Sequence, residues 1–330
     1  MGLGSTRPTA LVTGAAGFLG SHLTDRLLAE GFDVIGIDNL MTGDLCNLAS
    51  ALRDPHFHFH THDVRLPFGL YAQFIFNFAC PASPIHYQHD PIATFTTSVL
   101  GIIQIVEMAR GKKCRIIQAS TSEVYGDPLE HPQTESYWGH VNPIGVRSCY
   151  DEGKRAAESY LTDANRQKLV DARIVRIFNT YGPRMAFNDG RVVSSFIASA
   201  LDFKPLEITG SGEQTRSFCY VSDLVEGIYR IAMLDTYDGS PTNLGNPTET
   251  TIKELAQLVC KILGREEYKT KEISMPEDDP SRRCPDITRA QRLIGFNPVV
   301  KLGTGIARTI ADFIGRRKPI PLSSSDSMIL

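Results

Sequence analysis

Short apolar runs alternate with longer stretches of helical periodicity over the first part of the chain. Six runs have the length of strands, and several are uninterrupted, which is typical of strands buried on both faces. The predicted strands span residues 9–13, 32–37, 56–60, 74–78, 115–119 and 172–177. The helical patterns between them span residues 20–30, 91–110 and 149–166. Strands that alternate with helices in this order predict an α/β fold with a doubly wound parallel sheet.

The pattern changes after about residue 180, where the predicted elements become shorter. Helical periodicity continues near residues 191–202, 221–234, 251–263 and 302–314. We therefore expect a first domain over residues 1–180 and a smaller lobe over residues 181–330 that caps the sheet, with interleaved boundaries. The final stretch, 321–330, is rich in serine, and we expect it to be a frayed tail.

Composition limits the partners. The chain of 330 residues carries 34 Lys and Arg against 37 Asp and Glu, and no basic stripe interleaved with aromatic residues suggests nucleic acid. The expected partner is a small molecule or another subunit. The seven cysteines are scattered singly without a C-x-x-C pair, which argues against a disulfide framework and a zinc ribbon. This usage favours a reducing, cytoplasmic location.

Hydropathy gives a second expectation about location. No apolar stretch approaches the ~20 residues that a membrane span needs. The N-terminal segment leads almost directly into the first strand and leaves no room for a signal peptide. We therefore expect no membrane contact.

The first chemical motif is glycine-rich and follows the first predicted strand. Gly14, Gly17 and Gly20 open the first helix, where glycines let the backbone approach a pyrophosphate that the helix N-terminus then binds. The second strand ends at Asp38, where a carboxylate can hydrogen-bond an adenosine ribose and repel a 2′-phosphate. The next residue, Asn39, offers no cation to such a phosphate. The motif therefore predicts NAD rather than NADP.

The second motif, YDEGK, pairs Tyr150 with Lys154 near the start of a helix. Residues four apart share one helical face, so the ammonium can lie near the phenol and stabilise its anion. Thr121, at the end of the fifth strand, supplies a hydroxyl for the same substrate oxygen. Together these side chains can remove a proton from an alcohol while hydride leaves its carbon for NAD.

Histidine alternates along the third predicted strand, at positions 56, 58, 60 and 62. Alternating imidazoles on one face can bind a metal. An edge strand with a polar outer face explains the pattern better, because no step of the alcohol chemistry calls for a metal. We therefore expect an edge strand and no metal site.

Longer stretches of sequence resemble a known family. The stretches TGAAGFLGSHL and CYDEGKR are similar to motifs of the extended short-chain dehydrogenase/reductase superfamily. More specific are STSEVYG, YWGHVNPIG and DDPSRRCPDI, which resemble motifs of its UDP-glucuronate decarboxylases. The resemblance covers about residues 9–315. It implies a Rossmann-like domain that binds NAD, a smaller lobe that binds a UDP-sugar, and a homodimer.

The resemblance also implies contacts for individual residues. Cofactor contacts are expected from Gly14, Gly17, Phe18, Leu19, Gly20, Asp38, Asn39, Asp63, Val64, Ala79, Tyr150 and Lys154. Substrate contacts are expected from Pro81, Tyr87, Asn179, Arg184, Arg191, Arg216 and Arg283. Among them, Asn179 and Arg283 are expected on the UDP diphosphate, Arg191 beside the nucleotide, and Asp63 and Val64 beside the adenine.

Glu123, in STSEVYG, separates this chain from related dehydratases. Sugar 4,6-dehydratases are expected to carry an Asp-Glu pair here, whereas Ser122 precedes Glu123, so the acid that expels a hydroxyl is missing. A substrate whose C6 is a carboxylate needs no such acid. After oxidation at C4 it is a β-keto acid, and carbon dioxide leaves as an enolate forms. The resemblance places Arg216 facing the sugar carboxylate, and either Glu123 or Arg216 is expected to deliver the C5 proton.

Three alternatives stay open. Glu123 can instead cap the following turn. A UDP-sugar 4-epimerase would use the same Thr121, Tyr150 and Lys154 but would keep the carboxylate. A non-catalytic NAD-binding regulator would keep the glycines and would not need these three residues together.

The predicted dimer would use two helices, 91–110 and 149–166, which pair into a four-helix interface in this family. The apolar positions proposed for it are Ile102, Ile105, Val106, Ala156 and Ala157.

Overall fold

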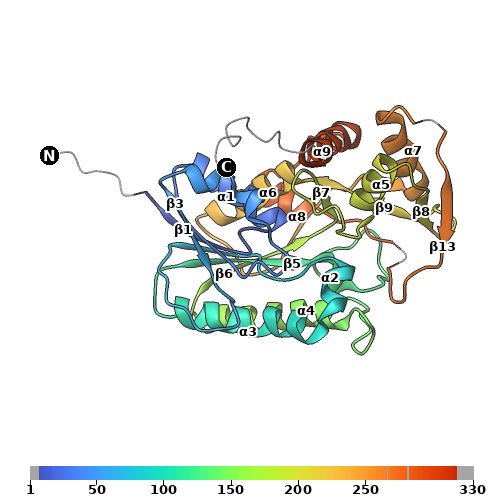
Figure 1. Ribbon diagram of the computed structural model, residues 1–330. Helices are drawn as coiled ribbons and strands as arrows, with labels where there is room; N and C mark the ends of the chain where they lie inside the picture. Colours follow the sequence, from blue (N-terminus) through green and yellow to red (C-terminus); the bar gives the residue numbers. More distant parts are fainter. Residues whose placement is uncertain (1–6, 266, 281, 318–330) are drawn as a thin grey trace, which may run out of the picture.

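A central sheet of seven parallel strands organises the molecule, in the order β11-β6-β5-β4-β1-β2-β3 (Figure 1). The computed structural model describes residues 7–265, 267–280 and 282–317. The predicted tail at 321–330 lies outside these residues. The strands of the sheet are β1 Thr9–Thr13, β2 Asp33–Asp38, β3 Phe57–Thr61, β4 Phe74–Asn77, β5 Arg115–Thr121, β6 Asp171–Ile177 and β11 Thr242–Leu244.

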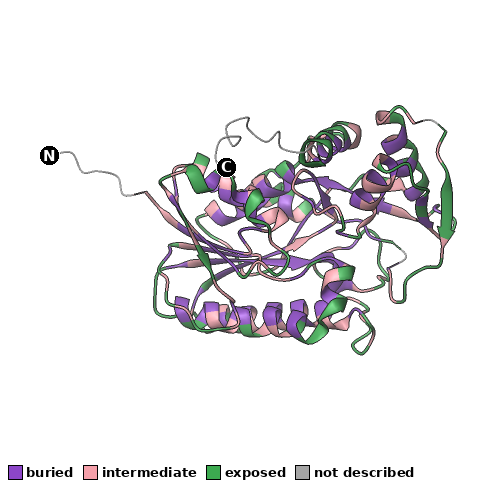
Figure 2. Ribbon diagram, viewed as in Figure 1, coloured by how far each residue is buried: buried purple, intermediate pink, exposed green. Residues whose placement is uncertain are grey.

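Helices cover both faces of this sheet. In Figure 1, α3 and α4 run side by side under one face, and α1, α6 and α8 lie over the other. Their bounds are α1 Phe18–Ala29, α3 Pro91–Ala109, α4 Ser148–Arg166, α6 Val221–Met233 and α8 Thr288–Ile294. Figure 2 shows the strands buried between the two helical layers. The doubly wound parallel sheet predicted from the sequence is thus confirmed.

The remaining elements form the smaller lobe and its connections. Two short sheets lie in the lobe, β8 with β13 in parallel and β9 with β12 antiparallel, and β7 pairs with β10 beside the core. These strands are β7 Thr180–Tyr181, β8 Leu206–Thr209, β9 Thr215–Ser217, β10 Cys219–Tyr220, β12 Glu249–Thr251 and β13 Thr270–Ile273. The other helical segments are α2 Pro84–His89, α5 Val192–Leu201, α7 Ile252–Ile262, α9 Leu302–Arg317, η1 Leu45–Leu48, η2 Ala51–Arg53 and η3 Ser122–Tyr125.

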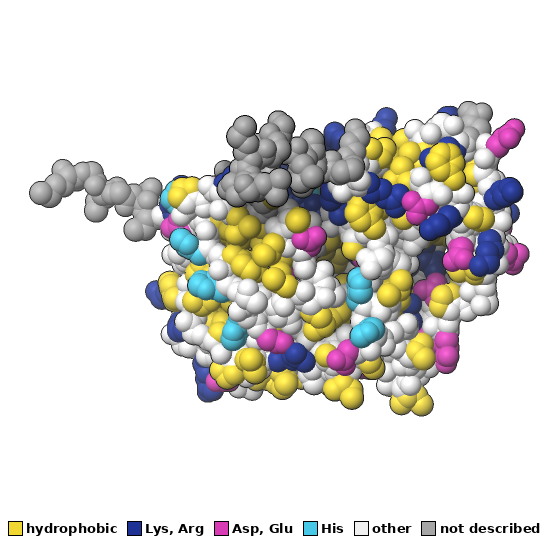
Figure 3. Space-filling view, viewed as in Figure 1, with side chains coloured by type: hydrophobic (Ala, Val, Ile, Leu, Met, Phe, Trp, Pro, Cys, Tyr) yellow, Lys and Arg dark blue, Asp and Glu magenta, His cyan; other side chains and the backbone are white. Residues whose placement is uncertain are grey.

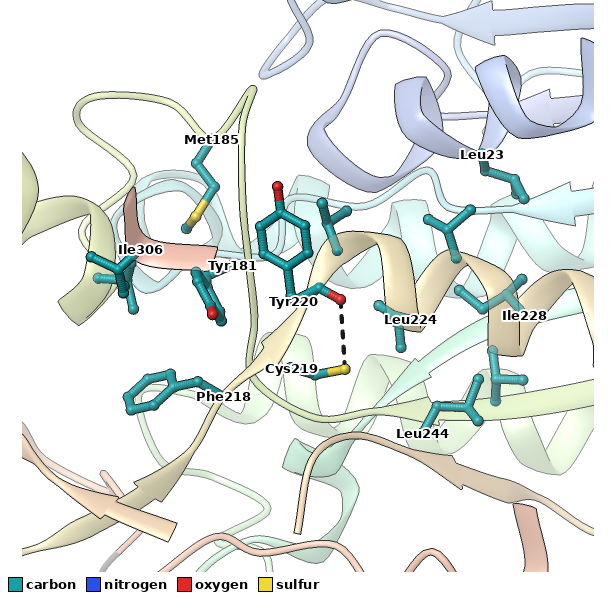
Figure 4. Close-up of a cluster of buried hydrophobic side chains, with 14 of the residues drawn as sticks. Leu23, Tyr181, Met185, Phe218, Cys219, Tyr220, Leu224, Ile228, Leu244 and Ile306 are labelled. Carbon is teal, nitrogen blue, oxygen red and sulfur yellow. Dashed lines mark hydrogen bonds between the residues drawn. The ribbon is translucent and has the colours of Figure 1, made fainter. Parts of the chain in front are cut away.

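The chain after residue 180 does not stay in the lobe. Its strand β11 pairs with β6 and completes the edge of the main sheet. One hydrophobic cluster joins the two parts: Figure 4 shows Leu23 of α1 and Leu224 of α6 in the same group of buried side chains as Leu244 of β11 and Ile306 of α9. The lobe and the sheet therefore share a core.

Helix α3 corrects one expectation from hydropathy. Its 19 residues are long and apolar enough to cross a membrane by length and composition. In the structure, 56% of its apolar window is buried, and the helix packs along α4. Packing in the core therefore explains the buried part of this apolar window, while the outer side of α3 stays apolar and exposed.

The histidine-rich strand β3 lies at the edge of the sheet, as predicted. His58 and His60 point to solvent, and the His56 imidazole contacts the Asp33 carboxylate at 2.8 Å. The pattern is that of a polar edge, which discourages pairing with other strands.

Candidate active site

A cavity of about 640 Å³ opens where the carboxyl ends of the central strands face the smaller lobe. Ligands bind at this edge in open α/β sheets. Seven Arg and Lys side chains line the cavity against five Asp and Glu, although the whole chain has a net charge of −3. In Figure 3, Lys and Arg gather on the side where Figure 1 places α5, α7 and β13. The cavity therefore suits a ligand with several negative charges.

The glycine-rich turn forms one end of the cavity. Gly14 has φ of +70°, and a Cβ there would approach the backbone of Phe78 to 2.8 Å, so a side chain does not fit. Helix α1 begins after Gly17, with no side chain capping its N-terminus and no acid in its first turn. Its free N–H groups and positive dipole end thus fit a pyrophosphate. Phe18, Leu19 and Gly20 also line this end.

Asp38 lies beside the same turn at the end of β2. Its carboxylate accepts hydrogen bonds from the backbone N–H of Ala16 at 3.0 Å and of Leu40 at 2.8 Å. Burial raises the pKa of this carboxyl, while these bonds oppose the change. Asp38 is thus fixed next to the turn, where it can meet a ribose hydroxyl.

The residues expected around the adenine lie outside the lining of the cavity. Asp63 is held by the Arg65 guanidinium at 2.6 Å and by the Asn39 amide at 3.2 Å, and the Arg65 hydrogen bond lowers the pKa of Asp63 to about 2. Val64 is buried against α3. The backbone N–H of Ala79 donates to the Thr13 hydroxyl at 3.3 Å. The adenine contacts of Asp63 and Val64 and the cofactor contact of Ala79 stay predictions.

Thr121, Tyr150 and Lys154 meet in the middle of the cavity. Thr121 ends β5, and its hydroxyl forms a hydrogen bond with the Tyr150 hydroxyl. Lys154 lies one turn along α4 from Tyr150, with its Nζ 5.7 Å from the phenol ring centroid. The Lys154 ammonium also donates to the Ala119 carbonyl at 2.9 Å. The structure therefore brings together the three residues that the sequence assigned to alcohol oxidation.

In the free protein, Tyr150 is not in the deprotonated form that a general base requires. Burial raises its pKa well above the usual value, and the nearby Cys80 thiol and Glu123 carboxylate act in the same direction, whereas the Thr121 hydrogen bond lowers it. Tyr87 stacks on Tyr150 with ring centroids 5.0 Å apart and planes 8° from parallel. Tyr150 is thus a neutral phenol in the free protein. A positive charge beside it is needed before it can act as a base.

Glu123 lies two residues after Thr121, the last residue of β5, in the short helix η3. Arg147 Nη2 contacts one carboxylate oxygen at 2.8 Å, and Arg283 Nη1 contacts the other at 2.7 Å. Burial would raise the pKa of Glu123, but the two guanidinium groups outweigh it and the pKa is lowered. Glu123 is therefore an ionised acceptor held from both sides. Its side chain does not cap the turn; the Thr121 hydroxyl does, accepting from the Glu123 N–H.

The ion pairs continue toward Arg216. Asp279 accepts from Arg147 at 3.2 Å and from Arg216 at 3.0 Å. Three buried arginines therefore share two carboxylates, Glu123 and Asp279, and an anionic substrate group would balance the remaining charge. Sequence reasoning missed Arg147 and Asp279. The signal for Arg147 was its place three residues before Tyr150, one helical turn away from the catalytic phenol.

Several donors on the cavity wall have no partner among the described residues. They are Tyr87 Oη, Arg147 Nε, Arg184 Nη1, Arg283 Nε and Arg283 Nη2. Buried donors without acceptors are costly, so ligand oxygens are expected to complete them. Arg283 also donates to the Asn179 amide oxygen at 3.3 Å. The contact of this pair with the diphosphate stays a prediction.

The other predicted substrate residues are divided between the cavity and its surroundings. Arg184 and Arg191 line the cavity, paired with Asp25 at 2.6 Å and with Asp189 respectively. Pro81 is buried between two lining residues without lining the cavity itself.

Comparison with family models matches residues 10–245 to the NAD dependent epimerase/dehydratase family. The chain belongs to this family. UDP-glucuronic acid decarboxylase 6 of Arabidopsis thaliana is 50% identical over 92% of this chain and 88% of that protein. UDP-glucuronic acid decarboxylase 1 of Xenopus tropicalis is 47% identical over 93% of this chain and 72% of that protein.

A solved structure of UDP-glucuronic acid 4-epimerase from Bacillus cereus, in complex with UDP-glucuronic acid and NAD, superimposes with a TM-score of 0.83. It is 25% identical and the match covers 93% of this chain and 99% of that one. NAD is the cofactor of this member of the epimerase/dehydratase family. The glycine turn, the open N-terminus of α1 and Asp38 are the residues that fit it.

Asp151, next to Tyr150, is a second buried acid that the sequence analysis did not single out. Its side chain is 6% exposed, and its Oδ1 has no hydrogen-bond partner among the described residues. Burial, followed by the negative charge of Glu123, raises the pKa of Asp151 to about 8, against the opposing effect of Arg147 and Arg283. Asp151 is therefore a neutral acid at pH 7.

Replacing Asp151 by Asn is expected to change how stability depends on pH. Because the pKa of Asp151 is raised on folding, its proton stabilises the native state fully below about pH 4, and this contribution is lost as the pH rises toward about 8. Asp151→Asn should therefore gain stability relative to the wild type from pH 5 to pH 8, on the order of a few kcal/mol. Urea unfolding at several pH values measures this. A constant difference would show that Asp151 is already ionised at pH 5.

Proposed function

We propose that the protein converts UDP-glucuronate to UDP-xylose and carbon dioxide. The observation that carries the proposal is the position of the Glu123, Arg147, Arg283 and Arg216 network beside Tyr150. It supplies positive charge for a diphosphate and a carboxylate next to a group that can oxidise an alcohol. Relatives that are 47–50% identical over most of the chain are named UDP-glucuronic acid decarboxylases, which supports the same assignment.

The chain's own residues prepare the C4 alcohol. Tyr150 takes the proton of the C4 hydroxyl, and the Thr121 hydroxyl orients the same oxygen. When bound, NAD would supply a hydride acceptor and donor for C4 and a positive charge that favours the Tyr150 anion. Lys154, which is buried beside the phenol, adds a second positive charge near it.

Decarboxylation follows from the ketone at C4. The C6 carboxylate is then β to a carbonyl, so the electrons of the broken C5–C6 bond move toward the C4 oxygen as an enolate. Tyr150 and Thr121 donate hydrogen bonds to that oxygen. Arg216 faces the carboxylate, while Glu123 holds Arg147 and Arg283 in place. Since Glu123 is ionised in the free protein, it has no proton of its own, and it can relay one to C5 only after taking it from solvent.

The second candidate is a UDP-glucuronate 4-epimerase, which would use the same three residues. The similarity to the Bacillus cereus enzyme supports it, but at 25% identity rather than 47–50%. An epimerase rotates the keto sugar and returns hydride to the other face, so its product keeps the carboxylate. Glu123 and Arg216 favour the decarboxylase.

Incubation with UDP-glucuronate labelled with deuterium at C4 distinguishes these reactions. We expect UDP-xylose and carbon dioxide, with the deuterium retained at C4 and little free NADH. In heavy water, new label should enter at C5 alone. A product that keeps its carboxylate would make the protein an epimerase, and stoichiometric release of NADH would show that hydride is not returned.

We also propose that the protein is a homodimer, although the residues first assigned to the interface were wrong. Ile102, Ile105, Val106 and Ala157 are buried within the subunit, packed beneath the sheet. Ala156 alone of that set is partly exposed. The outer side of α3 carries a different apolar stripe, formed by Ile92, Phe95, Val99, Leu100 and Ile103. This stripe lies beside α4, and a second copy of the pair would bury it.

Replacing Ile92 by Glu tests the dimer. Ile92 is 76% exposed, so the charge should not disturb the folded subunit, but it should weaken association by about tenfold or more. Light scattering against concentration measures this, and Val299→Glu, at an equally exposed residue far along the chain, is the matched control. A wild-type monomer at micromolar concentration would refute the proposal.

We propose a cytoplasmic location because of the state of the cysteines. All seven are free thiols, which a reducing compartment preserves.

A further inference from the structure

Three side chains that can ligate a metal converge outside the catalytic cavity. They are the His131 imidazole, the Glu249 carboxylate and the Cys284 thiol, whose ligand atoms all lie within 4.8 Å of one another. His131 Nε2 lies 3.1 Å from a Glu249 oxygen, while Cys284 Sγ donates to the Pro247 carbonyl at 3.3 Å. Among the described residues this is the one group of three such ligands. None of the three lines the catalytic cavity.

The backbone around the cluster is fixed before any ligand arrives. Gln133 is fully buried and joins the His131 segment to the Cys284 segment in two ways. Its N–H donates to the Cys284 carbonyl at 2.9 Å, and its side-chain oxygen accepts from the Cys284 N–H at 2.9 Å. Glu249 belongs to β12, which pairs with β9, and its second oxygen accepts from the Thr215 hydroxyl at 2.5 Å. Separate elements therefore hold all three ligands, with an outer hydrogen bond on the carboxylate.

The donor set indicates the class of metal. One nitrogen, one oxygen and one sulfur ligand suit Zn²⁺ or Co²⁺. The set does not suit Mg²⁺ or Ca²⁺, because these ions prefer oxygen ligands alone. The contact between His131 and Glu249 needs to open by only a few tenths of an ångström to reach the spacing of neighbouring ligands in a tetrahedral site. A dication would be neutralised by the Glu249 carboxylate and a Cys284 thiolate. The His131 and Glu249 side chains are 29% and 30% exposed, so water would complete the coordination of a bound metal.

We propose that His131, Glu249 and Cys284 form a zinc-class metal site that ties three segments of the chain together. These segments also carry arginines of the catalytic cavity. Arg216 lies on the strand that pairs with the strand of Glu249, and Arg283 directly precedes Cys284. Binding replaces the thiol proton: the S–H bond breaks, the metal–sulfur bond forms, and one proton leaves to solvent. Because binding releases a proton, metal affinity is expected to rise with pH.

Titration of the purified protein with Co²⁺ and with Zn²⁺ tests the site. We expect one equivalent to bind, with the absorption of a cobalt–thiolate bond, release of one proton, and a higher melting temperature. Cys284→Ser and His131→Ala should each lose this binding by more than the ~10- to 100-fold that loss of an outer partner costs. Mg²⁺ at the same concentration should not compete.

Cys46→Ser is the matched control, because Cys46 is the exposed thiol of the chain. Its cobalt spectrum should match that of the wild type. Melting of each variant without metal shows whether it is folded. Binding that persists in folded Cys284→Ser, or that disappears in Cys46→Ser, would overturn the proposal. The test does not use the decarboxylase reaction, so its outcome is independent of the proposed function.

Discussion

Tyr150→Phe is expected to lower the turnover of UDP-glucuronate by about 10²- to 10⁴-fold, the range for loss of a general acid or base. The phenol hydroxyl is the group proposed to take the C4 proton, and it forms a hydrogen bond with the Thr121 hydroxyl at the end of β5. The Phe ring can still stack on Tyr87, so NAD and UDP should bind nearly as well as before. Steady-state rates and calorimetry of both ligands measure the two effects separately.

Tyr125→Phe is the matched control for this variant. The Tyr125 hydroxyl is buried as well and hydrogen-bonds the Asn243 side chain at 2.7 Å, but it does not line the cavity. Its loss should cost about 1 kcal/mol or more of stability and leave turnover within a few-fold of the wild type. A Tyr150→Phe enzyme that keeps more than a tenth of its activity would remove Tyr150 from the role of base.

Glu123→Gln is expected to slow decarboxylation by about 10²- to 10³-fold while sparing the oxidation at C4. Removing the charge of Glu123 leaves Arg147 and Arg283 without their shared counter-ion, so the site becomes more positive. Extra positive charge stabilises the negatively charged carboxylate of the substrate. Decarboxylation removes this negative charge from C6 as carbon dioxide leaves, so the stabilisation is lost and the step becomes slower. The reaction should therefore stop at the 4-keto acid, and bound NADH should accumulate when UDP-glucuronate is added.

Glu158→Gln provides the comparison for Glu123→Gln. Glu158 is another buried glutamate, paired with Arg176 at 2.7 Å, and it lies outside the cavity lining. Its loss should lower stability, by up to ~3–5 kcal/mol, without accumulation of NADH. If Glu123→Gln fails to reduce NAD at all, Glu123 acts before the oxidation and its assignment to decarboxylation is wrong.

Six of the seven strands of the main sheet were predictable because they are short apolar or alternating runs separated by amphipathic helices. The predicted helix over 149–166 and the observed α4, Ser148–Arg166, differ by one residue. Strand β11 was missed, since its three residues lie between Pro241 and Gly245 and gain their place only by pairing with β6. Helices α2 and α8 were missed for the related reason that six or seven residues hold too few repeats to show a period.

For the site, the sequence was sufficient where spacing along one element determines geometry. Tyr150 and Lys154 share a helix, and Thr121 ends a strand, so their meeting follows from the fold. The ion pairs of Glu123 were not predictable, because Arg147 and Arg283 come from segments far apart in the chain. Asp151 was overlooked for the opposite reason: its position in YDEGK is plain, but its protonation depends on burial by neighbours that the sequence does not specify.

The pairing of β11 with β6 also governs how the chain is made. During synthesis β6 is complete at Ile177, and it remains an unpaired edge until Thr242–Leu244 has left the ribosome. An exposed edge strand rich in apolar residues is a template for pairing with other chains. The nascent protein therefore passes through a stage in which its cofactor-binding half is nearly complete and open to aggregation, and a fragment that ends at residue 180 would keep that edge permanently.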